Sequence, residues 1–345
     1  MQGSSLTTIK IGGVVPSFES GRLDEILPKL AGLSPQEIRV IGGGSNLALP
    51  DGDLVPRLFK LQGGGIELAD EALSGRFANR ATQVEEARYL AENKEGVLAL
   101  SESEQLAHNL AAIQGQVYIV ADAGVPWAAL VAKSLQMGLA GLQWYARIPC
   151  QVGGAVYNNI HGEKHLLSEV VAAVEVFNVT SATTYWIPAS ELAFGYDTSA
   201  LQGKPWLITR VLFALTPAPT PLLEQAKSLY QTWTSAKVKA QPAGANCGSV
   251  FQNLTSDQIQ HLPTSYTAAG WFLDQVGAKS EREGDLVVSD LHANFITNTG
   301  EATQAQLLTL IERLRLRVHQ EFGVTLHPEV YAWDEYGNAR PWQNL

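Results

Sequence analysis

Short apolar runs, separated by glycine turns and helical segments, characterise the first two thirds of the chain. Runs rich in β-branched and aliphatic residues predict strands over residues 38–41, 117–120, 170–177 and 206–212. A helix is expected to begin near Pro126, because proline fits the first helical turn, where its missing N–H group is not needed, and to end near Gly138. The pattern therefore predicts a region in which strands alternate with helices.

Three alternating prolines in residues 216–221 form the best candidate for a linker, because proline can continue neither a strand nor a helix. We therefore expect a first domain over residues 1–216 and a second over residues 222–345. Between about residues 63 and 105 the density of charged residues rises and the periodic pattern fades. We interpret that stretch as a surface insertion.

The second domain is expected to open with a helix over residues 222–237, and a glycine-rich strand follows over residues 247–251. One apolar stripe predicts a final amphipathic helix, and its members are Leu307, Ile311, Leu314, Val318 and Phe322. Thr303 and Gln306 have capping-box spacing at its start, and Gly323 follows as a C-terminal stop.

Charge and composition exclude several classes of protein. With 24 Lys and Arg against 34 Asp and Glu, the formal net charge is −10, which argues against a broad nucleic-acid-binding face. Only Cys150 and Cys247 carry thiols, and no histidine spacing suits a metal, so we assign neither a disulfide framework nor a metal site. The chain has no signal-peptide pattern and no apolar run of transmembrane length. We expect a cytoplasmic monomer.

Two glycine-rich turns are the strongest candidates for a binding site. The first, residues 42–46 with the sequence Gly-Gly-Gly-Ser-Asn, follows an apolar run, and glycine lets consecutive N–H groups turn inward to hold an anion. The second covers residues 148–155. A tight turn without a ligand explains either one alone, but two such turns could clamp a long ligand that carries two phosphates.

Further segments accompany these turns in a definite order. They are residues 8–13, 123–127, 138–142, 194–196, 248–253, 268–274, 292–296 and 328–330. The ordered set resembles the UDP-N-acetylenolpyruvoylglucosamine reductase (MurB) family, flavoenzymes that make the muramic acid precursor of peptidoglycan, and it spans most of the chain. The short distance from Tyr196 to Ser249 is similar to the family's more compact subgroup.

The resemblance implies an α+β protein with an FAD-binding domain of the vanillyl-alcohol-oxidase (PCMH) type, made of two subdomains, and a C-terminal α+β substrate domain. It also implies that FAD lies against both glycine turns. The positions that match its diphosphate cradle are Gly42, Gly43, Gly44, Ser45, Asn46 and Leu47. The positions that match the flavin lining are Gly124, Ile148, Pro149, Val152, Gly153, Gly154, Ala155 and Ile208.

The implied reaction is reduction of UDP-N-acetylglucosamine enolpyruvate, with NADPH as electron donor. A carbanion beside the substrate's carboxylate then needs a proton donor and groups that stabilise negative charge. Ser249 matches the family's proton donor, and Glu329 matches a glutamate that stabilises the intermediate, a role for which its pKa should be raised. Without the resemblance, a small residue in a tight strand and a solvated carboxylate are the simpler explanations.

Four further residues are the expected contacts of this UDP-sugar substrate. Asn253 and Asn294 match positions that contact the nucleotide. Lys237 and Lys239 lie near a basic residue of the family and could neutralise the diphosphate. The solvated end of a helix explains the two lysines equally well.

The chain departs from the family where the substrate's carboxylate is expected. The family has an arginine after the residue that matches Tyr196, which we count among the catalytic residues, and this chain has Asp197. A carboxylate is electrostatically unfavourable where an anion must bind. Arg147, directly before the second glycine turn, is our candidate for a replacement cation, and an ordinary surface arginine is the alternative.

Milder departures lie near the same site. Cys150 replaces a glycine, Gln252 replaces a lysine, Leu254 replaces a proline, and the turn at residues 159–162 is shorter than its counterpart. We interpret both cysteines as inert, small, apolar residues.

Three functional hypotheses stay open at this point. The leading one is the reductase just described, divergent at its carboxylate site. The second is an FAD-dependent oxidoreductase of the same fold that acts on a neutral or sugar-like substrate, which Asp197 would suit. The third is a relative that binds without turnover, with or without flavin; the joint presence of Ser249 and Glu329 speaks against it.

Overall fold

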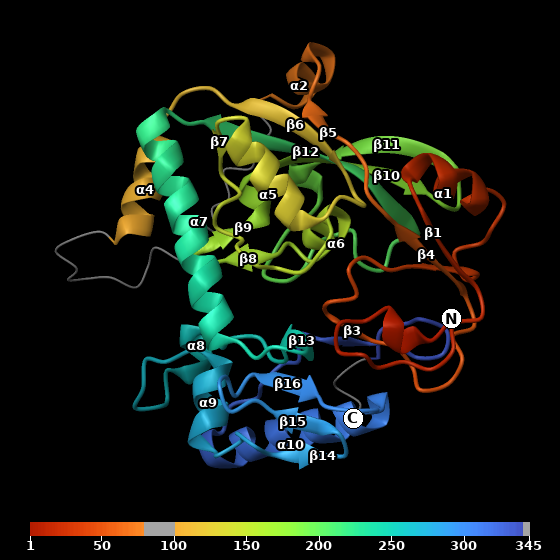
Figure 1. The fold of residues 1–345 in the computed structure, drawn as a ribbon, viewed down its shortest axis with the longest axis vertical. Helices are drawn as coiled ribbons and strands as arrows, with labels where there is room; N and C mark the ends of the chain where they lie inside the picture. The colour runs from red at the N-terminus through yellow and green to blue at the C-terminus, as the bar shows by residue number, and fades with distance from the viewer. Residues whose placement is uncertain (79–100, 341–345) are drawn as a thin grey trace.

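The computed structural model describes residues 1–78 and 101–340 (Figure 1). Near the N-terminus, a parallel three-stranded sheet has the order β1-β4-β2 and consists of β1 (Phe18–Gly21), β4 (Arg57–Leu61) and β2 (Ile38–Val40). Helix α1 (Leu23–Leu30) follows β1 and buries Ile26 and Leu30. Strand β2, which the sequence predicts, ends directly before the first glycine turn.

A larger, antiparallel sheet forms the second layer. Its order is β11-β10-β12-β6-β5, and β7 pairs with the end of β12. Its strands are β5 (Ile66–Leu68), β6 (Val117–Asp122), β7 (Leu139–Ala140), β10 (Val171–Asn178), β11 (Thr183–Pro188) and β12 (Trp206–Pro217). The three strands predicted in this region are confirmed as β6, β10 and β12.

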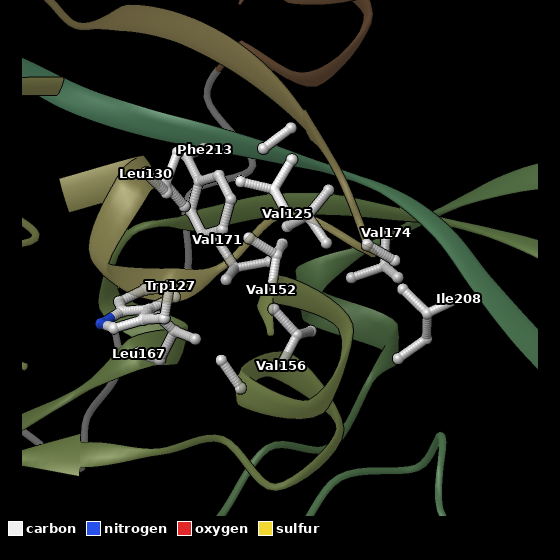
Figure 2. Close-up of a cluster of buried hydrophobic side chains, with 14 of the residues drawn as sticks. Val125, Trp127, Leu130, Val152, Val156, Leu167, Val171, Val174, Ile208 and Phe213 are labelled. Atoms are coloured by element: carbon white, nitrogen blue, oxygen red, sulfur yellow. The ribbon is translucent and has the colours of Figure 1, made fainter. Parts of the chain in front are cut away.

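Helices α5 (Trp127–Gln136) and α6 (Val152–Tyr157) pack against this sheet and enclose the larger hydrophobic core, which we call the first core (Figure 2). Trp127 lies edge-on to Phe213 of β12, with the ring centroids 6.4 Å apart. Helix α5 begins after Pro126 and ends before Gly138, as predicted, since Gly138 has a left-handed φ of 78°. The small elements of this region are the 3-10 helices Gly3–Ser5, Leu167–Glu169 and Ala189–Glu191 and the hairpin of β8 (His161–Gly162) and β9 (His165–Leu166).

The prediction of a linker over residues 216–221 is wrong, because most of these residues lie in a strand or a helix. Strand β12 continues through Pro217, because it pairs antiparallel with β7 there. Only two residues separate it from α7 (Thr220–Ala240), which has Pro221 in its first turn. The helix predicted over residues 222–237 is confirmed, but its apolar side chains lie against the first core, and Ala226 is completely buried there. We therefore infer that the chain changes from one core to the other after α7 rather than before it.

Helix α7 is 21 residues long and extends from the larger domain to the smaller one (Figure 1). Among the helices of the described ranges, none combines the length and the apolar character that crossing a membrane requires.

The C-terminal region builds a second core. An antiparallel sheet has the order β13-β16-β15-β14 and consists of β13 (Ala245–Ser249), β16 (Phe295–Asn298), β15 (Leu286–Val288) and β14 (Arg282–Glu283). The helices are α8 (Ser256–Ile259), α9 (Ala269–Gln275) and α10 (Gln304–Phe322). The predicted final helix is confirmed with its stripe, since Leu307, Ile311, Leu314 and Val318 are buried.

The N-terminal segment belongs to both regions. Ile9, Ile11 and Ala48 are completely buried in the second core, although they precede the first sheet or lie within it in sequence. Strand β3 (Leu47–Ala48) pairs in parallel with β17 (Tyr331–Ala332) near the other end of the chain. The residues just after the first glycine turn are therefore fixed to the C-terminal region.

The expected insertion at about residues 63–105 lies partly outside the described residues, which omit 79–100. Within the described part, β5 belongs to the antiparallel sheet rather than to a surface insertion, because it pairs with β6 at the edge of that sheet. Helix α2 (Glu71–Phe77) buries Phe77, and α4 (Glu102–Ala111) packs against α7.

The cap of α10 gives a test of this fold. Thr303 accepts a hydrogen bond from Gln306 N, and the Gln306 side chain accepts one from Thr303 N. Thr303→Ala should lower the free energy of unfolding by about 1 kcal/mol, because it leaves a helix N–H group without its partner. Thr309→Ala, at an exposed position of the same helix, should change it by less than about 0.5 kcal/mol. Chemical denaturation measures both, and equal losses would contradict the role of the cap.

Candidate functional site

The first glycine turn presents a row of unused hydrogen-bond donors. The backbone N–H groups of residues 42–46 donate no hydrogen bond to any other described residue. Gly44 is buried and the other four residues are partly buried, so these N–H groups are not fully hydrated by bulk water. Consecutive unpaired amides at the end of a strand form a nest that suits a phosphate. This is the feature that fits the diphosphate of the expected FAD.

The two glycine turns lie side by side. A Cβ atom on Gly42 would be 3.7 Å from Gly154 Cα, and one on Gly43 would be 2.9 Å from Pro149 O. Gly154 itself opens onto space, since a Cβ there would meet no described heavy atom within 4 Å. The turns are therefore close enough to contact the same ligand, as the sequence predicts.

Other residues expected to line the flavin have a different environment. The side chains of Val152, Ala155 and Ile208 belong to the first core, and Figure 2 shows Val152 and Ile208 among its members. The amides of Val152 and Gly153 donate to Val125 O and Ala123 O. Because these side chains are buried in the first core, only backbone atoms at these positions could contact a cofactor. Ile148 is partly buried and Pro149 is exposed.

Close backbone packing accounts for Gly124. A Cβ atom there would lie 2.8 Å from Gly63 O and 2.9 Å from Gln62 N. Such contacts are too short for any side chain, so glycine is required whether or not a ligand is near. Gln151 supports the same corner by donating to Leu61 O and Gly124 O, at 2.7 and 3.1 Å.

Asn46 joins the first glycine turn to Glu329. Asn46 Nδ2 donates to Glu329 O at 3.0 Å, and Tyr331 N donates to Asn46 O at 3.0 Å. Asn46 Oδ1 is buried without a hydrogen-bond partner in the described structure, so it is free to receive a donor. The turn and the residue expected to act as an acid are thus neighbours, although 283 positions separate them in sequence.

Thr8 joins the same turn to the strand of Ser249. Its backbone N donates to Gly44 O at 2.9 Å, and its hydroxyl donates to Asn246 O at 2.6 Å. Between Asn246 and Ser249 the pairing of β13 with β16 shifts register, and Gly248 has a φ of 80°. Such a bulge redirects the next side chain. Thr8 lies in one of the motifs that carry the resemblance, but nothing local in the sequence indicates this contact.

Ser249, at the end of β13, and Glu329 lie on adjacent segments of the chain. Glu329 N donates to Val250 O at 2.8 Å, directly after Ser249. Ser249 is partly buried, and within residues 1–78 and 101–340 its hydroxyl has no hydrogen-bond partner. The structure therefore brings together the two residues that the resemblance pairs in chemistry.

The surroundings of Glu329 favour its neutral form. Burial raises the pKa of its carboxyl group well above the usual range, and the nearby charge of Asp197 raises it further. The raised pKa predicted from the sequence is confirmed in direction. Asp197, however, is a cause that sequence reasoning did not foresee.

Asp197 lies in a network rather than facing empty solvent. Its Oδ1 atom is 3.2 Å from His161 Nδ1, and its Oδ2 atom accepts from Gln252 Nε2 at 3.2 Å. Tyr196 stacks on the His161 ring, with centroids 4.6 Å apart, and its hydroxyl is 3.3 Å from His161 Nε2. Sequence reasoning had found no role for His161. The only signal was that it lies in the shortened turn at residues 159–162.

The three expected cations occupy different environments. Arg147 is exposed, with a φ of 57°, and in the described part of the chain its guanidinium pairs with no carboxylate. Lys237 donates to Ala146 O at 2.8 Å, and burial lowers the pKa of its ammonium group. Lys239 is exposed. Lys237 and Arg147 therefore lie at the same loop, next to the second glycine turn.

The two asparagines also differ. Asn294 is buried, and its side-chain amide accepts from Phe251 N at 2.9 Å and donates to Phe251 O at 2.8 Å. It therefore fixes the strand that follows Ser249. Asn253 is exposed and accepts from Ala269 N at 3.1 Å.

Neither cysteine is reactive at neutral pH. Burial raises the pKa of the Cys150 thiol and of the Cys247 thiol to about 12. Both thiols therefore stay protonated, in agreement with the interpretation of these residues as inert.

Gly44 gives a direct test of the first glycine turn. Gly44 has a φ of 66°, and a Cβ atom would lie 2.0 Å from Leu6 O. Gly44→Ala should lower the free energy of unfolding by at least about 1–3 kcal/mol and reduce the flavin content of the purified protein. Gly52→Ala is the matched control, because its Cβ would meet no described atom within 4 Å. Thermal unfolding and flavin absorbance measure the two effects, and a wild-type result for Gly44→Ala would refute this assignment.

Glu329 predicts a pH-dependent stability. Because its pKa is raised on folding, the stability contributed by the protonated form is complete below about pH 4.5 and is lost as the pH rises through the folded-state pKa. Glu329→Gln removes this loss. Relative to wild type, its free energy of unfolding should therefore increase with pH above 4.5, by up to about 1.4 kcal/mol per pH unit. Urea denaturation across this range measures the difference. Exposed Glu335→Gln is the control, and parallel curves for both variants would exclude a neutral Glu329.

Comparisons with known proteins agree with this geometry. Residues 240–333 match the model of the C-terminal domain of UDP-N-acetylenolpyruvoylglucosamine reductase, and residues 80–186 match an FAD binding domain. A solved structure, the MurB reductase of Thermus caldophilus, superposes with a TM-score of 0.67 at 26% identity and covers 97% of this chain and 98% of that one. The expected fold class, an FAD-binding domain followed by a MurB-like domain, is thereby confirmed.

Curated relatives are also similar to this chain in sequence. The UDP-N-acetylenolpyruvoylglucosamine reductase of Gloeobacter violaceus is 35% identical over 215 residues, which cover 61% of this chain and 68% of the relative. That of Synechococcus sp. strain RCC307 is 29% identical over 339 residues, which cover 97% of this chain and 93% of the relative. The chain belongs to the UDP-N-acetylenolpyruvoylglucosamine reductase family.

Proposed function

We propose that this chain is an FAD- and NADPH-dependent enzyme that reduces UDP-N-acetylglucosamine enolpyruvate to UDP-N-acetylmuramate, a peptidoglycan precursor. One observation carries the proposal. The unpaired amides of residues 42–46 lie on a turn that Thr8 joins to the strand of Ser249 and that Asn46 joins directly to Glu329 O. A phosphate nest, a hydroxyl and a neutral carboxyl group are the parts that this reaction requires.

The chain's own residues would hold the cofactor by its diphosphate. The amides of residues 42–46 and Gly154 would receive the phosphate oxygens, and Asn46 Oδ1 would accept a hydrogen bond from the cofactor. When bound, FAD supplies the hydride that reduces the substrate, after it has itself been reduced by NADPH. Backbone edges at Gly124, at residues 148–155 and beside Ile208 would border the ring system.

Ser249 would donate the proton and Glu329 would stabilise the developing negative charge. Hydride addition to the vinyl group makes the carbon next to the carboxylate carbanionic, and a hydroxyl at hydrogen-bond distance can protonate it. A neutral Glu329 can donate a hydrogen bond to the enolate-like carboxylate, whereas an ionised one would repel it.

The remaining site residues would bind the substrate. Tyr196 lies beside the network of Asp197 and His161. Asn253 would contact the nucleotide, and Asn294 would position the strand after Ser249. The diphosphate would meet Lys237, Lys239 or Arg147 near the second glycine turn. A cytoplasmic location and a monomeric state remain part of the prediction.

Asp197 favours a second candidate, an FAD-dependent oxidoreductase of the same fold with a neutral or sugar-like substrate. One experiment separates the two candidates. The flavin is reduced with NADPH without oxygen and then mixed with the enolpyruvyl nucleotide. Reoxidation of the flavin supports the reductase, and a flavin that stays reduced refutes it.

Ser249→Ala tests the proton donor. The variant should keep the rate of flavin reduction by NADPH and slow reoxidation by the enolpyruvyl nucleotide by about 10²- to 10⁴-fold, because only the second step needs the proton. Stopped-flow absorbance of the flavin measures each step separately. Ser265→Ala, at an exposed position of the same domain, should keep both rates. A comparable loss in both steps would show that Ser249 is structural.

A further inference from the structure

Asp197 contacts two other places where the chain differs from the family pattern. Asp197, in the place of an arginine, lies 3.2 Å from His161 Nδ1 and accepts from Gln252, which stands in the place of a lysine. His161 belongs to the shortened turn. Residues that are 36 and 55 positions apart from Asp197 thus form one hydrogen-bonded set, which we call the Asp197 network.

The Asp197 network borders the reacting residues. Gln252 lies three positions after Ser249, and its backbone N donates to His327 O, close to Glu329. Gln202 Nε2 donates to Asp197 O at 3.1 Å and to Tyr331 OH at 3.2 Å, which ties the turn of Asp197 to strand β17. The charge of Asp197 therefore acts on the same site as Glu329.

Asp197 creates an electrostatic problem for an anionic ligand. Its side chain is only 12% exposed, so water screens its charge weakly. Gln252 and Gln202 donate hydrogen bonds but carry no charge. Among the described side chains, His161 is the one cationic partner within ion-pair distance of Asp197. The imidazole is 31% exposed, so it lies at the edge of the site.

We propose that His161 is a positioning residue of the substrate site: its protonated imidazole neutralises Asp197, and this allows the site to accept the carboxylate of the substrate. The inference rests on the proposed function. With His161 charged, the pair carries no net charge and the neutral Glu329 adds none. Without it, the anion would approach an uncompensated carboxylate.

Arg147 is the competing cation. It is exposed and pairs with no carboxylate in the described part of the chain, so it does not offset Asp197 directly. His161 is positioned by three contacts, the Asp197 carboxylate, the hydroxyl of Tyr196 and the face of its ring. The geometry therefore assigns the compensating role to His161.

The test is the dissociation constant of the oxidised holoenzyme for UDP-N-acetylmuramate, which carries the carboxylate, measured by flavin absorbance. His161→Gln should raise this constant, and the KM for the enolpyruvyl nucleotide, by about 10- to 100-fold, while flavin reduction by NADPH is unchanged. His161→Gln with Asp197→Asn should bind within a few-fold of Asp197→Asn alone, because the charge to be neutralised is gone. A double variant as weak as His161→Gln would overturn the proposal, as would wild-type binding by His161→Gln.

Controls separate this inference from misfolding and from the proposed function. UDP-N-acetylglucosamine lacks the carboxylate, so His161→Gln should bind it as wild type does; equal weakening for both ligands would overturn the proposal. His165→Gln removes a second histidine paired with a carboxylate, Glu169 at 2.8 Å, and should leave binding of both ligands intact. Thermal unfolding verifies each variant. If wild type neither binds UDP-N-acetylmuramate nor is reoxidised by the enolpyruvyl nucleotide, the proposed function itself fails.

Discussion

Two hydrogen-bonded tethers on the first glycine turn hold the candidate site together. Thr8 connects Gly44 to the strand that ends in Ser249, and Asn46 connects the end of the turn to the backbone of Glu329. Unpaired amides that are partly removed from water are costly, so such a turn keeps its shape only if its neighbours fix it. The same amides gain most from an anionic ligand. Cofactor binding and the placement of the two reacting residues are therefore coupled.

The N-terminal segment is buried in the second core, and this reinforces that coupling. Ile9, Ile11 and Ala48 lie in the second core, whereas Ala226 of α7 lies in the first. The N-terminus of α10 is also bound by Asp51, whose carboxylate accepts from Ala305 N at 3.0 Å. Because the second core buries apolar residues of the N-terminal segment, separating the two regions would expose hydrophobic surface. The first glycine turn and the segment of Glu329 consequently behave as parts of one unit.

The charged and polar groups of the site are arranged around the largely buried carboxylate of Asp197. Asp197 raises the pKa of Glu329 and is itself bonded to His161 and Gln252. The left-handed φ of Asp197, 53°, belongs to the tip of a tight turn between Gly195 and Thr198, a conformation that aspartate tolerates better than most residues. Three of the departures from the family pattern, at Asp197, at Gln252 and in the turn of His161, are thus connected by hydrogen bonds.

The sequence by itself determined the local elements and the chemistry of the glycine turns. The capping residues Thr303 and Gly323, the start of α5 after Pro126 and the donors of residues 42–46 act within a few positions, so their patterns can be read directly. Only the tertiary structure decided that β12 passes through Pro217, that α7 packs on the first core, and that His161 meets Asp197. Those outcomes depend on contacts between residues far apart in sequence. Local periodicity carries no information about such partners.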